Sequence, residues 1–132
     1  MKAQVSIEYM IVLGFVTFAV MSTLLIASYY SGFVQDKIKL NQVELMASKI
    51  INSAESVFYS GAPSQATVIV YIPQGVESIE LSNKDIIITT ETSSGIVKQA
   101  FSSNVVLEGS IPTNWGTKNI VLKAETNKVT IN

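Results

Sequence analysis

The residue types that can carry out chemistry are few in this chain of 132 residues. It has ten aspartates and glutamates and nine cationic side chains, all lysines, and it has no histidine and no cysteine. These absences exclude a His–Cys zinc site, a thiol nucleophile, a disulfide and an imidazole base. Without arginine, and with a formal net charge of −1, the chain is not expected to bind nucleic acid. We also expect no cofactor and no bound metal.

An enzyme would have to use the remaining carboxylates, lysines and hydroxyls. One candidate group for general acid–base catalysis consists of Asp85, Glu91 and Glu108 with Lys98 or Lys123. Surface ion pairs or solvated strand faces explain these charges better. The glycines form neither a dinucleotide-binding nor a phosphate-binding loop. We therefore predict that the chain is not an enzyme.

One carboxylate stands apart from the others. Glu8 directly precedes residues 9–35, which carry no charge at all. Because burying an unpaired carboxylate is costly, a glutamate inside a membrane or a helix bundle needs a partner. The alternative is that Glu8 lies at headgroup depth, in contact with water, and has no special role. Its position alone does not decide between these interpretations.

The uncharged segment 9–35 is long enough to cross a bilayer, since about 20 apolar residues suffice for a helical span. Tyr9 at one end, and Tyr29 and Tyr30 at the other, suit the aromatic belts of the two interfaces. A cleaved secretory signal fits poorly, because the apolar run exceeds the usual length of about 7–15 residues. A plain single-pass anchor remains an alternative. Several small or polar residues could allow a second helix to approach closely, and the alternative is that they are the ordinary composition of a transmembrane helix. These residues are Gly14, Ala19, Ser22, Thr23 and Ala27.

The helical pattern continues beyond the uncharged segment. Between residues 36 and 59 there is no proline or glycine, and apolar residues recur at spacings of three and four. These positions are Val43, Met46, Ala47, Ile50, Ala54, Val57 and Phe58. The charged and amide residues Lys39, Glu44, Lys49, Asn52 and Glu55 fall mainly on other faces. The sequence thus predicts one long helix over residues 4–60, whose second part, 36–60, lays an apolar stripe on the rest of the chain. The turn Gly61-Ala62-Pro63-Ser64 marks the predicted end of this helix.

Residues 61–132 are predicted to form a β-sheet domain. Short runs rich in Val, Ile and Thr alternate with turn signals such as Pro73-Gln74-Gly75 and Ser93-Ser94-Gly95. The expected strands are 66–72, 76–81, 85–91, 96–101, 105–108, 119–124 and 128–131. We expect a single antiparallel sheet of about four to six strands that covers the amphipathic part of the helix. Trp115 is expected to close the end of this sheet against the helix, although a role as a contact residue is an alternative.

The residues around Glu8 carry a family resemblance. Lys2-Ala3-Gln4-Val5-Ser6-Ile7-Glu8-Tyr9, followed by the apolar segment, resembles the class III signal peptide of archaeal type IV pilin-like proteins. Its pattern is a basic residue, a small residue, then Gln-x-Ser-x-Glu-Tyr, which Gln4, Ser6, Glu8 and Tyr9 match in register. The stretch Ile72-Pro73…Gly75…Glu77-Ser78-Ile79 also looks like such proteins. The small residue here is Ala3, where glycine is usual, and the Gly-Ile start typical of archaellins is absent.

The resemblance implies processing, a fold and partners. A prepilin peptidase would cut between Ala3 and Gln4, removing residues 1–3 and leaving Gln4 as the new N-terminus. Glu8, with Ser6 beside it, would then pair with the new amino group during assembly. The implied fold is α+β, a long helix with its C-terminal half on a small antiparallel β-sheet domain, known as the pilin lollipop. Lys2 places the N-terminus on the cytoplasmic side and the β-domain outside.

The resemblance therefore implies a pilin, a structural subunit of a surface filament for adhesion. Its partners would be further copies of itself in a helical homopolymer, the prepilin peptidase, and the assembly ATPase with its membrane platform. Before assembly the chain would lie in the cell membrane. The alternative is a minor pilin, a pseudopilin or another single-pass component of a secretion or uptake machine, because such proteins share the same N-terminal motif.

Overall fold

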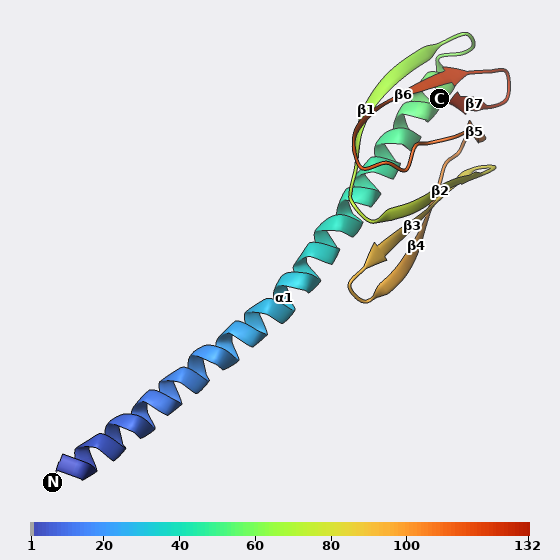
Figure 1. The fold of residues 1–132 in the computed structure, drawn as a ribbon. Helices are drawn as coiled ribbons and strands as arrows, with labels where there is room; N and C mark the ends of the chain where they lie inside the picture. Colours follow the sequence, from blue (N-terminus) through green and yellow to red (C-terminus); the bar gives the residue numbers. More distant parts are fainter. Residues whose placement is uncertain (1) are drawn as a thin grey trace. The chain divides into compact units, whose positions relative to one another are not determined.

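A computed structural model describes residues 2–132 of the chain, with side chains described from Gln4 onward. These residues form one helix and seven strands (Figure 1). Contacts divide the chain into two units, residues 1–35 and residues 36–132, which are described separately below. The elements are α1 (Lys2–Tyr59), β1 (Gln65–Ile72), β2 (Val76–Ser82), β3 (Asp85–Thr92), β4 (Gly95–Ser102), β5 (Leu107–Gly109), β6 (Gly116–Ala124) and β7 (Val129–Ile131).

The end of α1 follows from its local sequence. The helix stops at Tyr59, and Gly61 adopts a φ of 83°, which glycine reaches without steric cost. The backbone N–H of Gly61 donates to the carbonyl of Phe58 at 3.0 Å, so one of the otherwise free carbonyls of the last turn is satisfied. The predicted stop at the Gly61–Pro63 turn is therefore correct.

The strands of the second unit form two sheets, and the expectation of one antiparallel sheet is wrong. The larger sheet has four strands in the order β1-β6-β7-β5, and the smaller has three in the order β2-β3-β4. Only the β5–β7 pair is parallel. The antiparallel hairpins β2–β3 and β3–β4 join neighbours in the sequence, whereas β1 pairs with the distant β6 over its whole length. Such long-range pairing depends on the core rather than on turn signals.

One hydrophobic core joins the C-terminal part of α1 to both sheets. Helix residues Val43, Ala47, Ile50 and Ala54 are fully buried, and they recur at spacings of three and four as the sequence predicts. The sheets contribute further buried side chains, among them Val68, Val70, Ile72, Ile86, Ile88, Leu107, Ile120, Leu122, Val129 and Ile131. Figure 1 shows both sheets along this part of the helix. The α+β fold class, with the long helix packed by its C-terminal half on a β-domain, is confirmed.

Close backbone approach fixes the parallel pair of the larger sheet. A Cβ atom on Gly109, at the end of β5, would lie 2.0 Å from the carbonyl oxygen of Ile131 in β7. Gly109 also has a φ of 121°, which side-chain-bearing residues rarely adopt. Only glycine therefore allows β5 to join the larger sheet at this register.

Candidate functional site

The residues of the processing and pairing motif occupy the first turns of α1. Gln4 and Glu8 are four residues apart, so the helix places them one turn apart on one face. Gln4, Ser6, Glu8 and Tyr9 are all exposed. Among residues 4–132, the side chains of Gln4, Ser6 and Glu8 make no hydrogen bond or ion pair, and the side chain of Ala3 lies outside the described residues. The Glu8 carboxylate is thus free for a partner outside this set.

The uncharged segment 9–35 forms a helix that meets the length and composition requirements of a membrane span. Its large apolar side chains are exposed throughout, from Tyr9 to Val34. The rings of Tyr29 and Tyr30 meet edge to face, with centroids 6.3 Å apart. The apolar surface of this segment therefore needs a covering that residues 4–35 do not supply themselves.

Three hydroxyl groups within this segment are satisfied by the helix itself. Thr17, Ser22 and Thr23 donate to the carbonyls four residues earlier, at 2.7, 2.8 and 2.9 Å respectively. These three side chains therefore present no unsatisfied hydroxyl donor to an apolar neighbour. A Cβ atom on Gly14 would meet nothing within 4 Å, so this position offers open space to an approaching helix. Both observations suit an apolar surrounding, whether lipid or other helices.

The first charged residue after the uncharged segment attaches α1 to the smaller sheet. The Asp36 carboxylate accepts hydrogen bonds from the hydroxyl and the backbone N–H of Ser93, in the β3–β4 turn. These bonds, the hydroxyl first, hold the pKa of Asp36 below its ordinary value. One turn later, the Lys39 ammonium donates to the carbonyl of Glu91 at 3.2 Å. The contacts between α1 and the β-domain therefore begin at the residue where the uncharged segment ends.

Two further charged residues of α1 bridge to the β-domain. The Lys49 ammonium donates to the carbonyl of Ile69 in β1 at 2.7 Å. The Glu55 carboxylate accepts from the backbone N–H and the side-chain amide of Asn104, at 2.9 and 3.0 Å. Sequence reasoning assigned these charges to faces away from the apolar stripe and missed that they flank it and bond across its borders. The periodicity gives the face of a charge, but its partner depends on the tertiary fold.

The residues of the acid–base alternative do not converge. Asp85 and Glu91 are six residues apart on β3, or roughly 20 Å at 3.3 Å per residue. Asp85 instead accepts from the hydroxyl of Ser102 at 2.6 Å. Within residues 2–132 there is no cluster of acids that would hold a metal ion.

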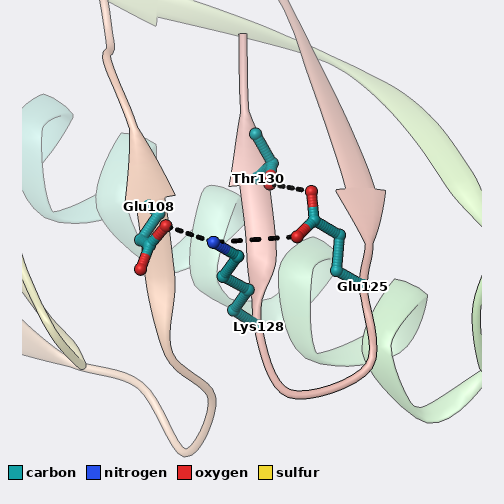
Figure 2. Close-up of polar contacts among 4 residues, drawn as sticks. All are labelled: Glu108, Glu125, Lys128 and Thr130. Atoms are coloured by element: carbon teal, nitrogen blue, oxygen red, sulfur yellow. Dashed lines mark hydrogen bonds and ion pairs between the residues drawn. The ribbon is translucent and has the colours of Figure 1, made fainter.

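Glu108, the third acid of that set, belongs to an ion-pair cluster with Lys128 (Figure 2). The Lys128 ammonium lies 2.6 Å from Glu108 and 3.7 Å from Glu125, and these contacts raise the pKa of Lys128. Glu125 also accepts from the hydroxyl of Thr130 at 2.8 Å. The cluster ties β5, β7 and the turn before β7 together at an exposed surface, which is a structural arrangement.

Trp115 does not close the sheet against the helix, so that expectation is wrong. Its side chain is 66% exposed, just before β6. Along β6 the residues Ile120, Leu122 and Ala124 point to the core, while Thr117, Asn119 and Val121 are exposed. Trp115, like these exposed residues, has an odd residue number, so it falls on the same side of the alternation. This alternation could have predicted from the sequence that Trp115 is exposed.

With this geometry established, the chain was compared with known proteins. No family model, curated protein or solved structure matches it.

Proposed function

We propose that the chain is a pilin, the structural subunit of an archaeal type IV pilus-like surface filament. A prepilin peptidase removes residues 1–3, and the mature chain, starting at Gln4, assembles through its N-terminal helix. One observation carries the proposal. The Gln-x-Ser-x-Glu-Tyr motif opens a single helix whose large apolar side chains stay exposed through Val34, whereas an apolar stripe that includes Val43, Ile50 and Val57 is buried. The proposed role in adhesion rests on the resemblance of the motif alone.

The uncovered segment explains how one helix can serve in two places. In the membrane, lipid covers most of residues 9–35, and in a filament other copies of the chain would cover the segment instead. The transfer exchanges one apolar surrounding for another, so tight packing and dispersion have to stabilise the filament. The self-satisfied hydroxyls of Thr17, Ser22 and Thr23 are compatible with both states.

Glu8 supplies the specific contact in this scheme. Cleavage before Gln4 creates an α-amino group, which is largely protonated at neutral pH. In an apolar helix bundle this ammonium and the Glu8 carboxylate each relieve the cost of burying the other. Because the side chain of Glu8 makes no hydrogen bond or ion pair among residues 4–132, its carboxylate is available to the ammonium of a neighbouring copy.

The substitution Glu8→Ala tests the proposal. We expect the variant to insert into the membrane as the unaltered chain does but to give no filaments, because the amino group is then buried without a partner. Glu44→Ala is the matched control, since Glu44 is an exposed acid on the same helix within the second unit. The measurement is the amount of subunit in membrane and in sheared surface material. Normal filaments from Glu8→Ala cells would contradict the proposal.

A further inference from the structure

An apolar groove lies between α1 and β1 in the second unit. Its volume is about 300 Å³, and its lining is Gln42, Leu45, Met46, Lys49, Ile69, Val70 and Tyr71. Leu45 is 65% exposed, Ile69 56% and Tyr71 49%. Three large apolar side chains thus stand at the surface of a domain that otherwise has a well-buried core.

The groove carries almost no charge. Its only charged residue is Lys49, whose ammonium donates to the carbonyl of Ile69 at the edge of the larger sheet. A lysine at a sheet edge hinders the addition of another strand, so an occupant would contact side chains rather than extend the sheet. The bordering face of β1 and β6 has no carboxylate: its exposed residues are Gln65, Thr67, Ile69, Tyr71, Thr117, Asn119, Val121 and Lys123.

This composition is typical of the centre of a protein–protein interface. Such centres are depleted in charged residues and enriched in aromatic ones. Two aromatic residues are exposed near this end of the β1–β6 pairing: Tyr71, which pairs with Thr117, and Trp115, which directly precedes Gly116. The groove, bounded by a helix and a strand, suits an apolar helix laid along it.

The uncharged segment of α1 offers an occupant of this kind. At about 1.5 Å per residue, residues 9–35 extend over roughly 40 Å, whereas the hydrocarbon core is about 30 Å thick. With Glu8 at the cytoplasmic interface, about seven residues extend beyond the hydrocarbon on the outer side. This surplus, residues 29–35, holds the exposed rings of Tyr29, Tyr30 and Phe33 and no charge. It therefore leaves apolar rings on the same side of the membrane as the β-domain.

We propose that the groove of one subunit binds the aromatic segment 29–33 of a second copy of the chain. The contact rests on the proposed function, since it joins copies within a filament. It would cover Leu45, Ile69 and Tyr71 with rings that lipid does not cover. The contact is head-to-tail, with different surfaces on the two copies, which is the geometry that builds open helical polymers.

Cross-linking between two kinds of subunit tests the contact directly. The chain has no cysteine, so Leu45→Cys and Phe33→Cys chains, expressed together, carry one thiol each. A short thiol cross-linker should then give a dimer in sheared filaments, which chains of either kind alone should not give. Ile96→Cys with Phe33→Cys is the matched control, because Ile96 is 63% exposed on β4 of the other sheet.

The outcomes separate the two proposals. Filaments that form without the Leu45–Phe33 dimer, or that give the Ile96 dimer equally well, would overturn the groove contact alone. Failure of the cysteine-free chain to form filaments would overturn the proposed function, and the contact with it.

A second pair of variants tests the energetic weight of the groove. Ile69→Thr with Tyr71→Thr should lower the filament yield at least about tenfold, as loss of an interface centre does. Ile96→Thr should leave the yield unchanged. Both positions are exposed, so the thermal unfolding of the unassembled chain should not change. Normal filament yield from the double variant would contradict the contact. If the filaments also failed to attach to surfaces, the groove would instead bind an external partner.

Discussion

The two halves of α1 belong to one helix but differ in what covers them. Residues 9–35 carry no charge and have exposed apolar side chains, whereas between Val43 and Val57 an apolar stripe of the helix is buried against two sheets. Continuous helical structure therefore does not require a uniform environment. The difference shows where the chain supplies its own core and where it needs lipid or other subunits.

The change between the two halves is marked by charge. Asp36 is the first charged residue after the uncharged segment, and it is also the first helix residue to bond to the β-domain, through Ser93. Four charged residues of the second half bond to the sheets or their turns: Asp36, Lys39, Lys49 and Glu55. Truncating a buried side chain of the second half should consequently lower the stability of the fold. Truncating an exposed apolar side chain of residues 9–35 should instead impair assembly.

The largest expected effect on stability comes from truncating a covered side chain. Ile50→Ala should lower the free energy of unfolding of the β-domain by about 2–5 kcal/mol, because Ile50 is fully buried and its removal leaves a cavity. Leu25→Ala, in the uncovered half, is the matched control and should change it by less than about 0.5 kcal/mol. Denaturant unfolding of the detergent-solubilised chain, followed by circular dichroism, measures both. Equal losses would show that the uncovered half is also packed within the chain.

A smaller effect is expected where a charge borders the buried stripe. Glu55→Ala removes the acceptor of two hydrogen bonds from Asn104 and should cost about 1–2 kcal/mol. Glu44→Ala, an exposed acid on the same helix, should be neutral to within about 0.5 kcal/mol. The same unfolding experiment compares them. Identical behaviour of the two variants would mean that the Asn104 contact does not hold α1 to the sheet.

The smallest effect is a pH dependence at the start of the covered half. Ser93 lowers the pKa of Asp36, so the ionised form is favoured in the folded state. Its stabilising contribution should be present above the pKa of the unfolded chain and be lost as the pH falls through the lower pKa of the folded chain. Asp36→Asn should remove this acid-side dependence. NMR titration of the Asp36 carboxyl and of the Ser93 amide checks it, and an Asp36 pKa at or above its ordinary value would contradict it.

The local elements could be predicted from the sequence, but their long-range arrangement could not. The spacing of Val43, Ala47, Ile50 and Ala54 gave the buried face of α1, and Gly61 marked its end. The hairpins β2–β3 and β3–β4 follow from turn signals between neighbouring runs. The division into two sheets and the parallel β5–β7 pair depend on contacts between segments distant in the sequence, which no local pattern encodes.

The candidate site shows the same limit. The motif at Gln4, Ser6, Glu8 and Tyr9 was visible because its residue types and spacing are specific. The groove was not, because Leu45 and Ile69 lie on different elements and look like ordinary core residues in the sequence. Trp115 was wrongly placed, although the alternation along β6 indicates an exposed position for it.

The most direct test of the account is the intact mass and N-terminal sequence of the subunit in filaments sheared from cells. We expect abundant filaments whose subunit begins at Gln4, with residues 1–3 removed. A subunit that retains Met1, or a chain found in membranes and never in filaments, would contradict it.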